Sequence, residues 1–488
     1  MSTGESFIAR VVGAFIRSKV TPLVIGFSIF LGILSVMNLP REEEPQISVP
    51  VFDIFVAYPG ATAEEVERRI VNVGERKLWE LPGVEYIYSM TQADGAIITV
   101  RFKVGEDTEK SLIKLYTKVY SNLDLLAKGG TQPLIKIRSI DDVPIMTLTF
   151  HSASLDPVGL RKVVSNLQNS VNAIPEVSET QITGGRKRQF RVLLDEQKLN
   201  ARFLNALEVS DLIQRSNVKA SAGHLQSRPE LISVESDGFF RSREDLENVV
   251  VGVSQGGEVY LKDVASVVDG PDEEETAVSF QKGHEGPFEA VTLAVSKRKG
   301  ANASHLCESI LKRVKGLKGS VIPADVSYEV TRNYGETAEE KSNELLFHMA
   351  LDILGVTLLM GITLGWRESG VVAIAIPMTL SLTLAGFHFL GFTLNRITLF
   401  ALIFSIGILV DDPIVGVENI VRHLRMVKNK GRALIDVIVE AVQEIQSPLI
   451  LATLTVIAAI LPMAFVSGLM GPYMRPIPIG ASLAMVFS

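Results

Sequence analysis

Cysteine is nearly absent from this sequence, whose 488 residues include only Cys307. A single thiol excludes an intrachain disulfide framework, although an oxidising compartment stays open. Charge is scarce as well, because only 21% of the residues are charged while 47% are hydrophobic. The net charge of -7 argues against nucleic acid as a partner, since phosphate binding needs a basic surface. Low charge and high hydrophobicity together indicate a membrane protein.

Two common motifs are also missing. No glycine-rich nucleotide-binding loop occurs, so the sequence disfavours transport driven by ATP. The first apolar run is too long for the core of a cleavable signal peptide, and no A-x-A cleavage pattern follows it. We therefore interpret this run as a membrane span.

Long apolar runs, by contrast, are plentiful. Residues 20–39 carry no charge. As a helix they cover about 30 Å, the thickness of a bilayer core. Further transmembrane helices are predicted at 345–366, 370–390, 396–417, 446–467 and 475–488. The last run reaches Ser488 without a stop signal, so we interpret it as a truncated sixth span and the chain as a fragment.

Basic residues predict the direction in which the chain crosses the membrane. Arg17 and Lys19 directly precede the first span, and five cations lie in the loop at 422–432. Because cytoplasmic loops carry an excess of Lys and Arg, segment 1–19 and the basic loop and helix at 418–445 are predicted to be cytoplasmic. The large region 40–340 is then predicted to lie outside the cytoplasm.

The region 40–340 repeats a pattern of strand, helix and strand. Periodicity predicts this pattern at 51–104, 145–194 and 288–331. Such units are typical of split βαβ, ferredoxin-like modules, although any α/β domain stays open. Residues 197–270 interrupt the pattern and contain a Ser- and Gly-rich loop at 217–238, which predicts a projecting hairpin.

Two adjacent acids, Asp411 and Asp412, lie inside an otherwise apolar helix. An aspartate at mid-bilayer costs about 2.5–3.5 kcal/mol on insertion scales, so two of them indicate a function. Carboxyl groups this close titrate as a coupled pair, which suits a proton relay. A polar pair that only fixes helix packing and a metal site stay open as alternatives.

Two further residues modify this hypothesis. Asp352 is another acid in a predicted span, and we expect it on a polar stripe that faces the bundle interior. Pro413 cannot donate a hydrogen bond to the carbonyl group of Leu409, which predicts a weakened helix beside the acidic pair. A simple kink and a hinge with water access are both open.

Several short motifs resemble one family of membrane proteins. The most specific is Gly407–Asn419, GILVDDPIVGVEN, and Pro40–Pro45, Tyr58–Thr62 and Pro462–Phe465 also match. They resemble the resistance–nodulation–division (RND) transporters, most closely the hydrophobic and amphiphilic efflux, AcrB-like branch. The resemblance covers essentially the whole chain, as the N-terminal half of such a transporter.

The resemblance implies an α+β membrane protein. A transmembrane α-helical bundle would carry a large periplasmic domain of ferredoxin-like split βαβ subdomains. It implies a first porter subdomain at 40–132, a second at 133–180 and 271–332, and an inserted docking subdomain at 181–270, whose hairpin reaches a neighbouring protomer. It also implies a homotrimer in the inner membrane, a periplasmic adaptor, an outer-membrane channel, and a second half with the lysine that pairs with the acids.

The family assigns roles to individual positions. Asp411 and Asp412 match its proton-carrying aspartates, Asp352 falls near an acidic position of its second helix, and Pro413 replaces a small residue. Positions that line its drug pocket are mostly not aromatic here, which argues against broad drug binding but not against export of some amphiphile. The matching pocket residues are Val143, Ile145, Ile182 and Thr183, with Tyr328 as the remaining aromatic.

We therefore expect a secondary active transporter, not an enzyme, which uses no cofactor and exchanges protons for hydrophobic or amphiphilic compounds. A metal-ion exporter of the same family stays open, although Met90 and Met146 are isolated rather than paired. A SecDF-like helper of protein translocation also stays open, but its periplasmic region is typically smaller and lacks the hairpin. A chain that serves only as an interaction partner stays open as a third alternative.

Overall fold

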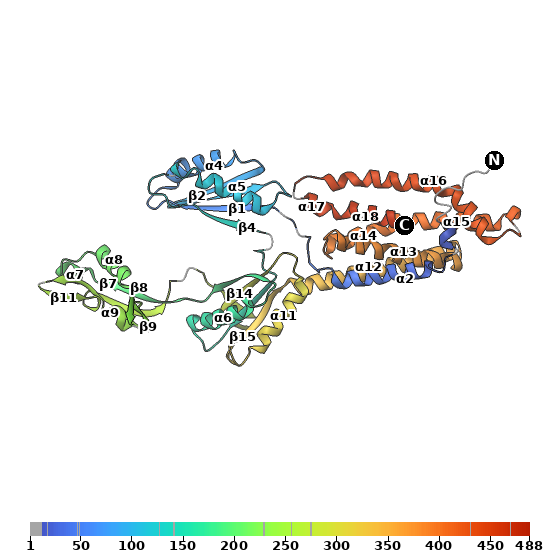
Figure 1. Ribbon diagram of the computed structural model, residues 1–488. Helices are drawn as coiled ribbons and strands as arrows, with labels where there is room; N and C mark the ends of the chain where they lie inside the picture. The colour runs from blue at the N-terminus through green and yellow to red at the C-terminus, as the bar shows by residue number, and fades with distance from the viewer. Residues whose placement is uncertain are drawn as a thin grey trace.

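The computed structural model describes residues 12–488 apart from positions 17, 46, 48, 126, 140, 141, 228, 229, 255, 274, 275, 430 and 469. Side chains at 222, 225, 227 and 230–232 also lie outside the description, as do residues 1–11 of the predicted cytoplasmic segment. The molecule is elongated, with a helical bundle at one end (Figure 1). Three α/β lobes, each with its own core, make up the rest, and we name them the first, second and inserted lobes.

The first lobe is a four-stranded antiparallel sheet with helices packed on one face. Its elements are β1 (Val51–Ala57), α3 (Ala63–Val66), η1 (Glu67–Val71), α4 (Asn72–Leu78), β2 (Val84–Gln92), β3 (Gly95–Phe102), α5 (Thr108–Tyr120), η2 (Leu123–Leu125) and β4 (Leu134–Arg138). Phe52, Ile54 and Val56 alternate inward from β1 because successive strand residues point to opposite faces. The strand order β2-β3-β1-β4 is that of a split βαβ unit.

The second lobe repeats this topology. Its elements are β5 (Met146–His151), α6 (Pro157–Asn172), β6 (Val177–Gly184), β13 (Ser279–Lys282), β14 (Glu285–Lys297), α11 (Ala303–Gly316) and β15 (Ser327–Asn333). β14 pairs with both β6 and β5, and β5 pairs with β15. The order β6-β14-β5-β15 therefore corresponds strand by strand to that of the first lobe.

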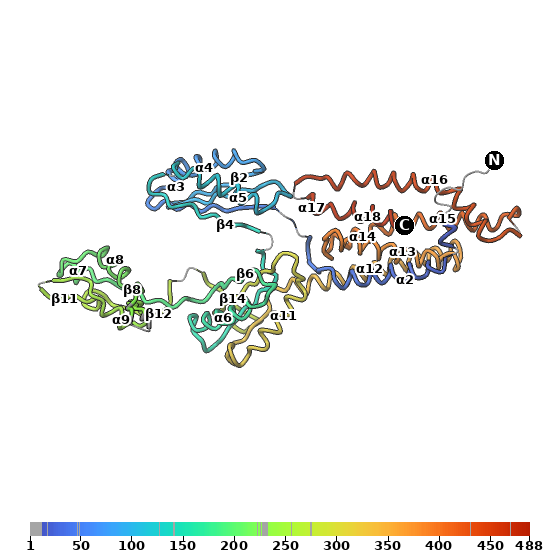
Figure 2. The backbone as a smooth tube through the Cα atoms, viewed as in Figure 1, coloured from blue at the N-terminus to red at the C-terminus, as the bar shows by residue number. Residues whose placement is uncertain are grey.

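The inserted lobe lies between β6 and β13 in the chain and farthest from the bundle in space (Figure 2). Its elements are β7 (Arg188–Leu194), α7 (Glu196–Ala201), α8 (Ala206–Ser216), β8 (Lys219–Ser227), β9 (Glu230–Asp237), α9 (Arg243–Glu247), β10 (Val250–Ser254), β11 (Gly257–Tyr260), α10 (Leu261–Val264) and β12 (Ala265–Pro271). β8 and β9 form an antiparallel hairpin where the sequence predicts one.

Strand pairing moves two of the predicted boundaries. The strand at 188–194 pairs with β12 in the inserted lobe, so it is β6 that completes the second lobe, up to Gly184. β4 pairs with β1, which extends the first lobe beyond residue 132 to Arg138. The pattern at 288–331 is the second half of the second lobe rather than a further copy. Alternating residues reveal a strand but not its partner, which explains these differences.

The helical bundle contains the apolar segments of the chain. Its elements are α2 (Thr21–Asn38), α12 (Tyr334–Thr363), α13 (Trp366–Phe389), α14 (Arg396–Leu409), α15 (Asp411–Arg425), η4 (Val427–Asn429), α16 (Leu434–Ile460), η5 (Leu461–Phe465), α17 (Met470–Met474) and α18 (Pro476–Phe487). Within the described residues, five segments are long and apolar enough to cross a membrane: α2, α12, α13, α14 with α15, and α16 with η5.

Helix ends differ from the predicted spans because hydropathy marks only the apolar part of a helix. α12 already begins at Tyr334, directly after β15, and so runs without interruption from the second lobe into the bundle. α16 begins at Leu434, inside the segment predicted as a basic loop and helix, and continues into the predicted fifth span as far as Ile460. The predicted fourth span is divided between α14 and α15.

A core substitution tests the second lobe. Phe150 is fully buried and packs beside Tyr328, with 5.6 Å between ring centroids. Phe150→Ala should lower the free energy of unfolding by about 3–5 kcal/mol, because it leaves a cavity in the sheet–helix core. Val330→Ala on the exposed side of β15 is the control, and thermal unfolding of the purified protein is the measurement. Equal effects of the two variants would contradict the described core.

Candidate functional site

The acidic pair lies at the junction of α14 and α15. α14 ends at Leu409, α15 begins at Asp411, and Val410 lies between them in helical geometry. Pro413 accounts for this interruption because it has no N–H group to donate to the carbonyl oxygen of Leu409. The backbone ladder resumes with a hydrogen bond of 3.2 Å from the Ile414 amide to the carbonyl oxygen of Val410.

The two acids differ in their surroundings. Asp412 is half-buried, and its Oδ2 accepts a hydrogen bond of 3.3 Å from the hydroxyl group of Thr453 on α16. The same hydroxyl group lies 3.0 Å from the carbonyl oxygen of Leu449 in its own helix. Asp411, one residue earlier, is exposed. Asp412 therefore connects α15 to α16, whereas Asp411 faces away from the described chain.

Asp411 belongs to an open apolar stripe along α14 and α15. Phe400, Phe404 and Val415 are 52%, 44% and 42% exposed, and Gly407 is exposed between them. Spacings of three and four residues place these positions on one helical face. An intramembrane acid is rarely directed at lipid, so this face is suited to contact with another protein segment.

Asp352 does not face the bundle interior, contrary to expectation. The packed face of α12 is formed by Met349, Ile353 and Val356, whereas Asp352 and its neighbour Leu351 are exposed. One polar residue in a span could not define which face of the helix packs inward.

The residues expected to line a substrate pocket fall into separate groups. Ile182 and Tyr328 pack against the core of the second lobe, but on the opposite edge strands β6 and β15. Thr183, beside Ile182, is exposed. Only Val143 and Ile145 share a cavity, of about 250 Å³, at the junction of the second lobe and the bundle. The structure therefore does not bring all five residues together.

Three consecutive acids surround that junction cavity. Oε1 of Glu42 lies 2.7 Å from Nζ of Lys297, with side chains only 3% and 11% exposed. Glu44 accepts a hydrogen bond of 2.7 Å from Tyr473, which, with burial, raises the pKa of Tyr473 to about 12. Arg396, at the start of α14, lies 3.3 Å from Glu44. The sequence showed these acids as a motif but did not reveal that Glu42 pairs with Lys297 of the second lobe.

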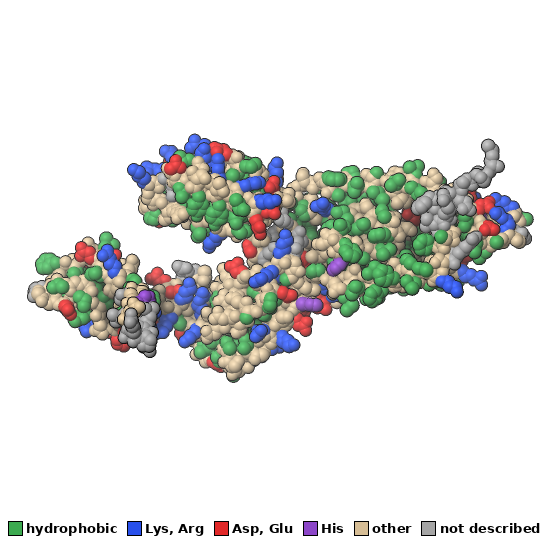
Figure 3. Space-filling view, viewed as in Figure 1, with side chains coloured by type: hydrophobic (Ala, Val, Ile, Leu, Met, Phe, Trp, Pro, Cys, Tyr) green, Lys and Arg blue, Asp and Glu red, His purple; other side chains and the backbone are tan. Residues whose placement is uncertain are grey.

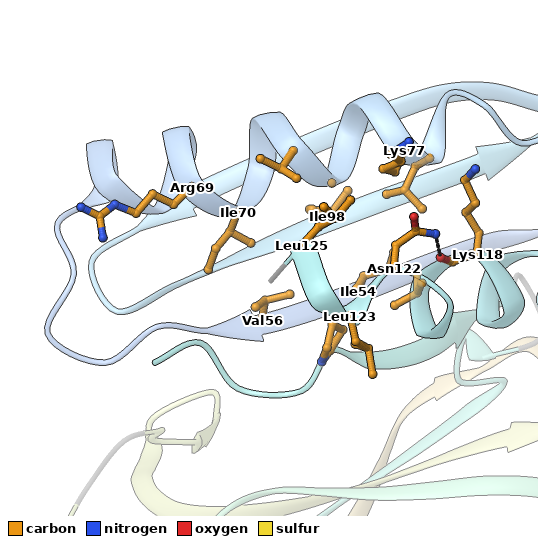
Figure 4. Close-up of a pocket in the computed structure, with 15 residues that line it drawn as sticks. Ile54, Val56, Arg69, Ile70, Lys77, Ile98, Lys118, Asn122, Leu123 and Leu125 are labelled. Carbon is orange, nitrogen blue, oxygen red and sulfur yellow. Dashed lines mark hydrogen bonds between the residues drawn. The ribbon is translucent and has the colours of Figure 1, made fainter. Parts of the chain in front are cut away.

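A second pocket lies inside the first lobe, between its sheet and its helices (Figure 4). Ile70 points from its helix towards the strands, where Ile98 forms part of the floor. Lys118 and Lys77 at the edge both contact Glu80 and hold the pKa of that carboxyl group below its usual range. The pocket has about 80 Å³. Ligand sites typically have about 300–1,000 Å³, so this one is too small for a drug-sized compound.

The chain thus combines a helical bundle that carries an acidic pair with two α/β lobes of the same topology. The model of the AcrB/AcrD/AcrF family matches residues 11–488. The chain belongs to this family. Its members are RND transporters rather than enzymes, as the motif at Gly407–Asn419 indicates.

Curated RND relatives cover nearly all of this chain. The toluene efflux pump membrane transporter TtgB of Pseudomonas putida is 28% identical over 99% of the chain and 45% of its own length. The multidrug resistance protein MdtC of Escherichia coli is 27% identical over 97% of the chain and 46% of its own length. The chain thus spans just under half the length of these relatives.

The ion pair at the junction yields a stability prediction. Glu42→Gln should lower the free energy of unfolding by about 3–5 kcal/mol, because Lys297 then keeps a buried charge without its counter-ion. Glu42→Leu combined with Lys297→Met should recover most of this loss. Thermal unfolding in detergent is the measurement, and Glu64→Gln in the exposed pair with Arg68 is the control, with an expected loss of about 1 kcal/mol or less. A double variant as unstable as Glu42→Gln would contradict this view.

Proposed function

We propose that this RND chain exports hydrophobic or amphiphilic compounds in exchange for protons. The observation that carries the proposal is the placement of Asp411 and Asp412 at an interrupted helix within the apolar bundle. Asp412 on α15 contacts Thr453 on α16. A change in the protonation of Asp412 would therefore alter a contact between two helices. The names of the relatives, a toluene efflux pump and a multidrug resistance protein, support the class of substrate.

The orientation that we propose places the lobes in the periplasm and the bundle in the inner membrane. Lys and Arg side chains gather at the end of the bundle farthest from the lobes (Figure 3). They include Arg422, Arg425, Lys428 and Arg432, on and after α15. Because cytoplasmic loops are enriched in cations, this end faces the cytoplasm.

The lobes fit the roles that RND transporters require. We assign the first and second lobes to the first and second porter subdomains and the inserted lobe to the docking subdomain. Its hairpin, β8 with β9, would reach a neighbouring protomer of a homotrimer. A periplasmic adaptor and an outer-membrane channel would complete a tripartite pump, and substrate would come from the periplasm or the outer leaflet.

Proton uptake would act through the contacts of the acids. A proton on Asp412 removes the charge that the Thr453 hydroxyl group stabilises, so α15 and α16 can shift relative to each other. Asp352 on α12 is a third candidate for the relay. One charge moving through 100 mV supplies about 2.3 kcal/mol, enough to bias a two-state domain.

The bundle and the second lobe share direct connections through which a shift could travel. α12 follows β15 without a loop, and the buried pair of Glu42 and Lys297 joins the end of α2 to β14. We propose that this movement opens and closes the junction cavity beside Val143 and Ile145. Ile182, Thr183 and Tyr328 would line a second part of the substrate path.

Asparagine substitutions test the relay. Asp411→Asn and Asp412→Asn should each abolish efflux of a fluorescent dye from cells, because the amide cannot bind and release a proton, while the amount of protein in the membrane stays normal. Asp436→Asn, on the exposed first turn of α16, is the control and should keep efflux. Normal efflux in both pair variants would remove the proton-relay role.

A further inference from the structure

A polar seam runs between α15 and α16. Asp412, Gly416, Asn419 and His423 lie on one face of α15, because spacings of four, three and four residues repeat along a helix. Besides the contact of Thr453 with Asp412, α16 makes two further contacts with this face. The amide group of Asn419 donates a hydrogen bond of 2.7 Å to the carbonyl oxygen of Ala441. The imidazole of His423 lies 2.5 Å from the carboxylate of Glu444.

His423 is a buried titratable group that the proposed relay leaves unused. It is only 3% exposed, whereas the side chain of its partner Glu444 is 49% exposed. Its Nε2 is the atom in contact with the carboxylate. A carboxylate only accepts hydrogen bonds, so Nε2 carries the proton and Nδ1 keeps a lone pair. Nδ1 has no hydrogen-bond partner among the described residues.

The charged groups nearest His423 lie on α15, on α16 and in the segment between them. Glu444 is shared with Arg422, whose Nη2 lies 2.7 Å from the other carboxylate oxygen. Glu440 on α16 is occupied by Arg432, at 2.6 Å, and Lys428, at 3.5 Å. The C-terminal end of α15, two residues beyond His423, attracts a positive charge.

Two other helices, α13 and α14, also pack on α15. α13 carries Arg367 and Glu368 in its first turn, and neither forms an ion pair with His423 in the described part of the chain. α14 carries one charge, Arg396, at its opposite end. A protonated imidazole would therefore have Glu444 as its one direct counter-ion among these groups.

Open space lies beside Gly416, four residues along α15 from Asp412. A β-carbon at Gly416 would meet no heavy atom within 4 Å outside its own helix segment. Asp412 and His423 lie about 16 Å apart along α15, at about 1.5 Å per residue. Water bound in this space would need polar partners, which Asp412 and Asn419 supply on the same helix face.

We infer that His423 and Glu444 form the proton-release site of the transporter, at the end of the seam opposite Asp412. The inference rests on the proton exchange proposed above and adds the route by which protons leave. It places release beside Arg422 in the last turn of α15, where the basic segment begins and where the side chain of Glu444 is exposed.

The transfer is a simple exchange of one proton. The O–H bond of protonated Asp412 breaks and leaves a carboxylate, while water in the seam carries the proton to His423. An N–H bond forms with the lone pair of Nδ1, and the imidazolium is stabilised by Glu444. The proton on Nε2 then passes to Glu444 and on to water, and tautomerisation of the imidazole returns the remaining proton from Nδ1 to Nε2. One proton is thus released for each one taken up, and no electrons change hands.

The test measures export by the complete transporter in liposomes, with Nile red as an uncharged probe. The pH on the lobe side is fixed, and the pH on the release side is varied from about 6 to 8. Wild-type transport should slow as the release side becomes more acidic. His423→Gln keeps a donor for Glu444 but cannot titrate. It should transport at about one tenth of the wild-type rate or below, and this rate should not depend on the release-side pH.

A second pair of variants tests the open space. Gly416→Leu should fill it and slow transport at every pH, whereas Gly416→Ala adds one methyl group and should keep the wild-type rate. If Gly416→Leu transports normally, the seam is not the route and the inference is overturned. Thermal unfolding checks each variant, and Glu444→Gln carries the pH test if His423→Gln does not fold.

The remaining outcomes separate this inference from the proposed function. A His423→Gln profile equal to wild type, or a slower one with unchanged pH dependence, would overturn the release site and leave His423 a structural role. Asp412→Asn is measured beside it. Inactive Asp412→Asn with normal His423→Gln rejects only the release site, whereas active Asp412→Asn rejects proton exchange itself. His348→Gln, on the exposed face of α12, is the matched control and should behave as wild type.

Discussion

A carboxylate in hydrocarbon loses the water that stabilises its charge, and the bundle is arranged around this cost at Asp411 and Asp412. The helix is interrupted beside the pair, where Pro413 removes a backbone donor. Thr453 supplies one hydrogen bond to Asp412 from the neighbouring helix. Asp411 lies on the open stripe with Phe400 and Phe404, a face suited to contact with another protein surface.

A second buried charge joins the bundle to the α/β region. Glu42 follows the first span and forms an ion pair with Lys297 at the end of β14. α12 begins directly after β15. Both connections involve strands of the same five-stranded sheet. Because packed sheets and helices move as rigid units, a displacement of α2 or α12 would displace the second lobe as a whole. The first lobe follows Glu42 in the chain, and residues around Glu85 and Lys103 line a cavity together with Val466 of the bundle.

The sequence patterns predicted where strands and helices lie more accurately than which strands pair with one another. Alternation identified the strand at 188–194, yet it pairs with β12, because hydrogen bonds across a sheet leave no trace in a single strand. The repeated lobes were visible as repeated patterns, whereas the place where the inserted lobe divides the second one depends on the pairing of β6 with β14. Hydropathy likewise located the spans but not the start of α16 at Leu434.

The sequence by itself determined apolar segments long enough to cross a membrane, the motif with Asp411 and Asp412, the interruption at Pro413 and membership of the RND family. Each is a local property: apolar length, a charge within it, or a missing N–H group. Only the tertiary structure decided that Asp352 lies outside the packed face, that the five expected pocket residues are dispersed, and that Glu42 and His423 are buried beside Lys297 and Glu444. Burial and partnership depend on chain segments far apart in sequence, and folding alone brings them together.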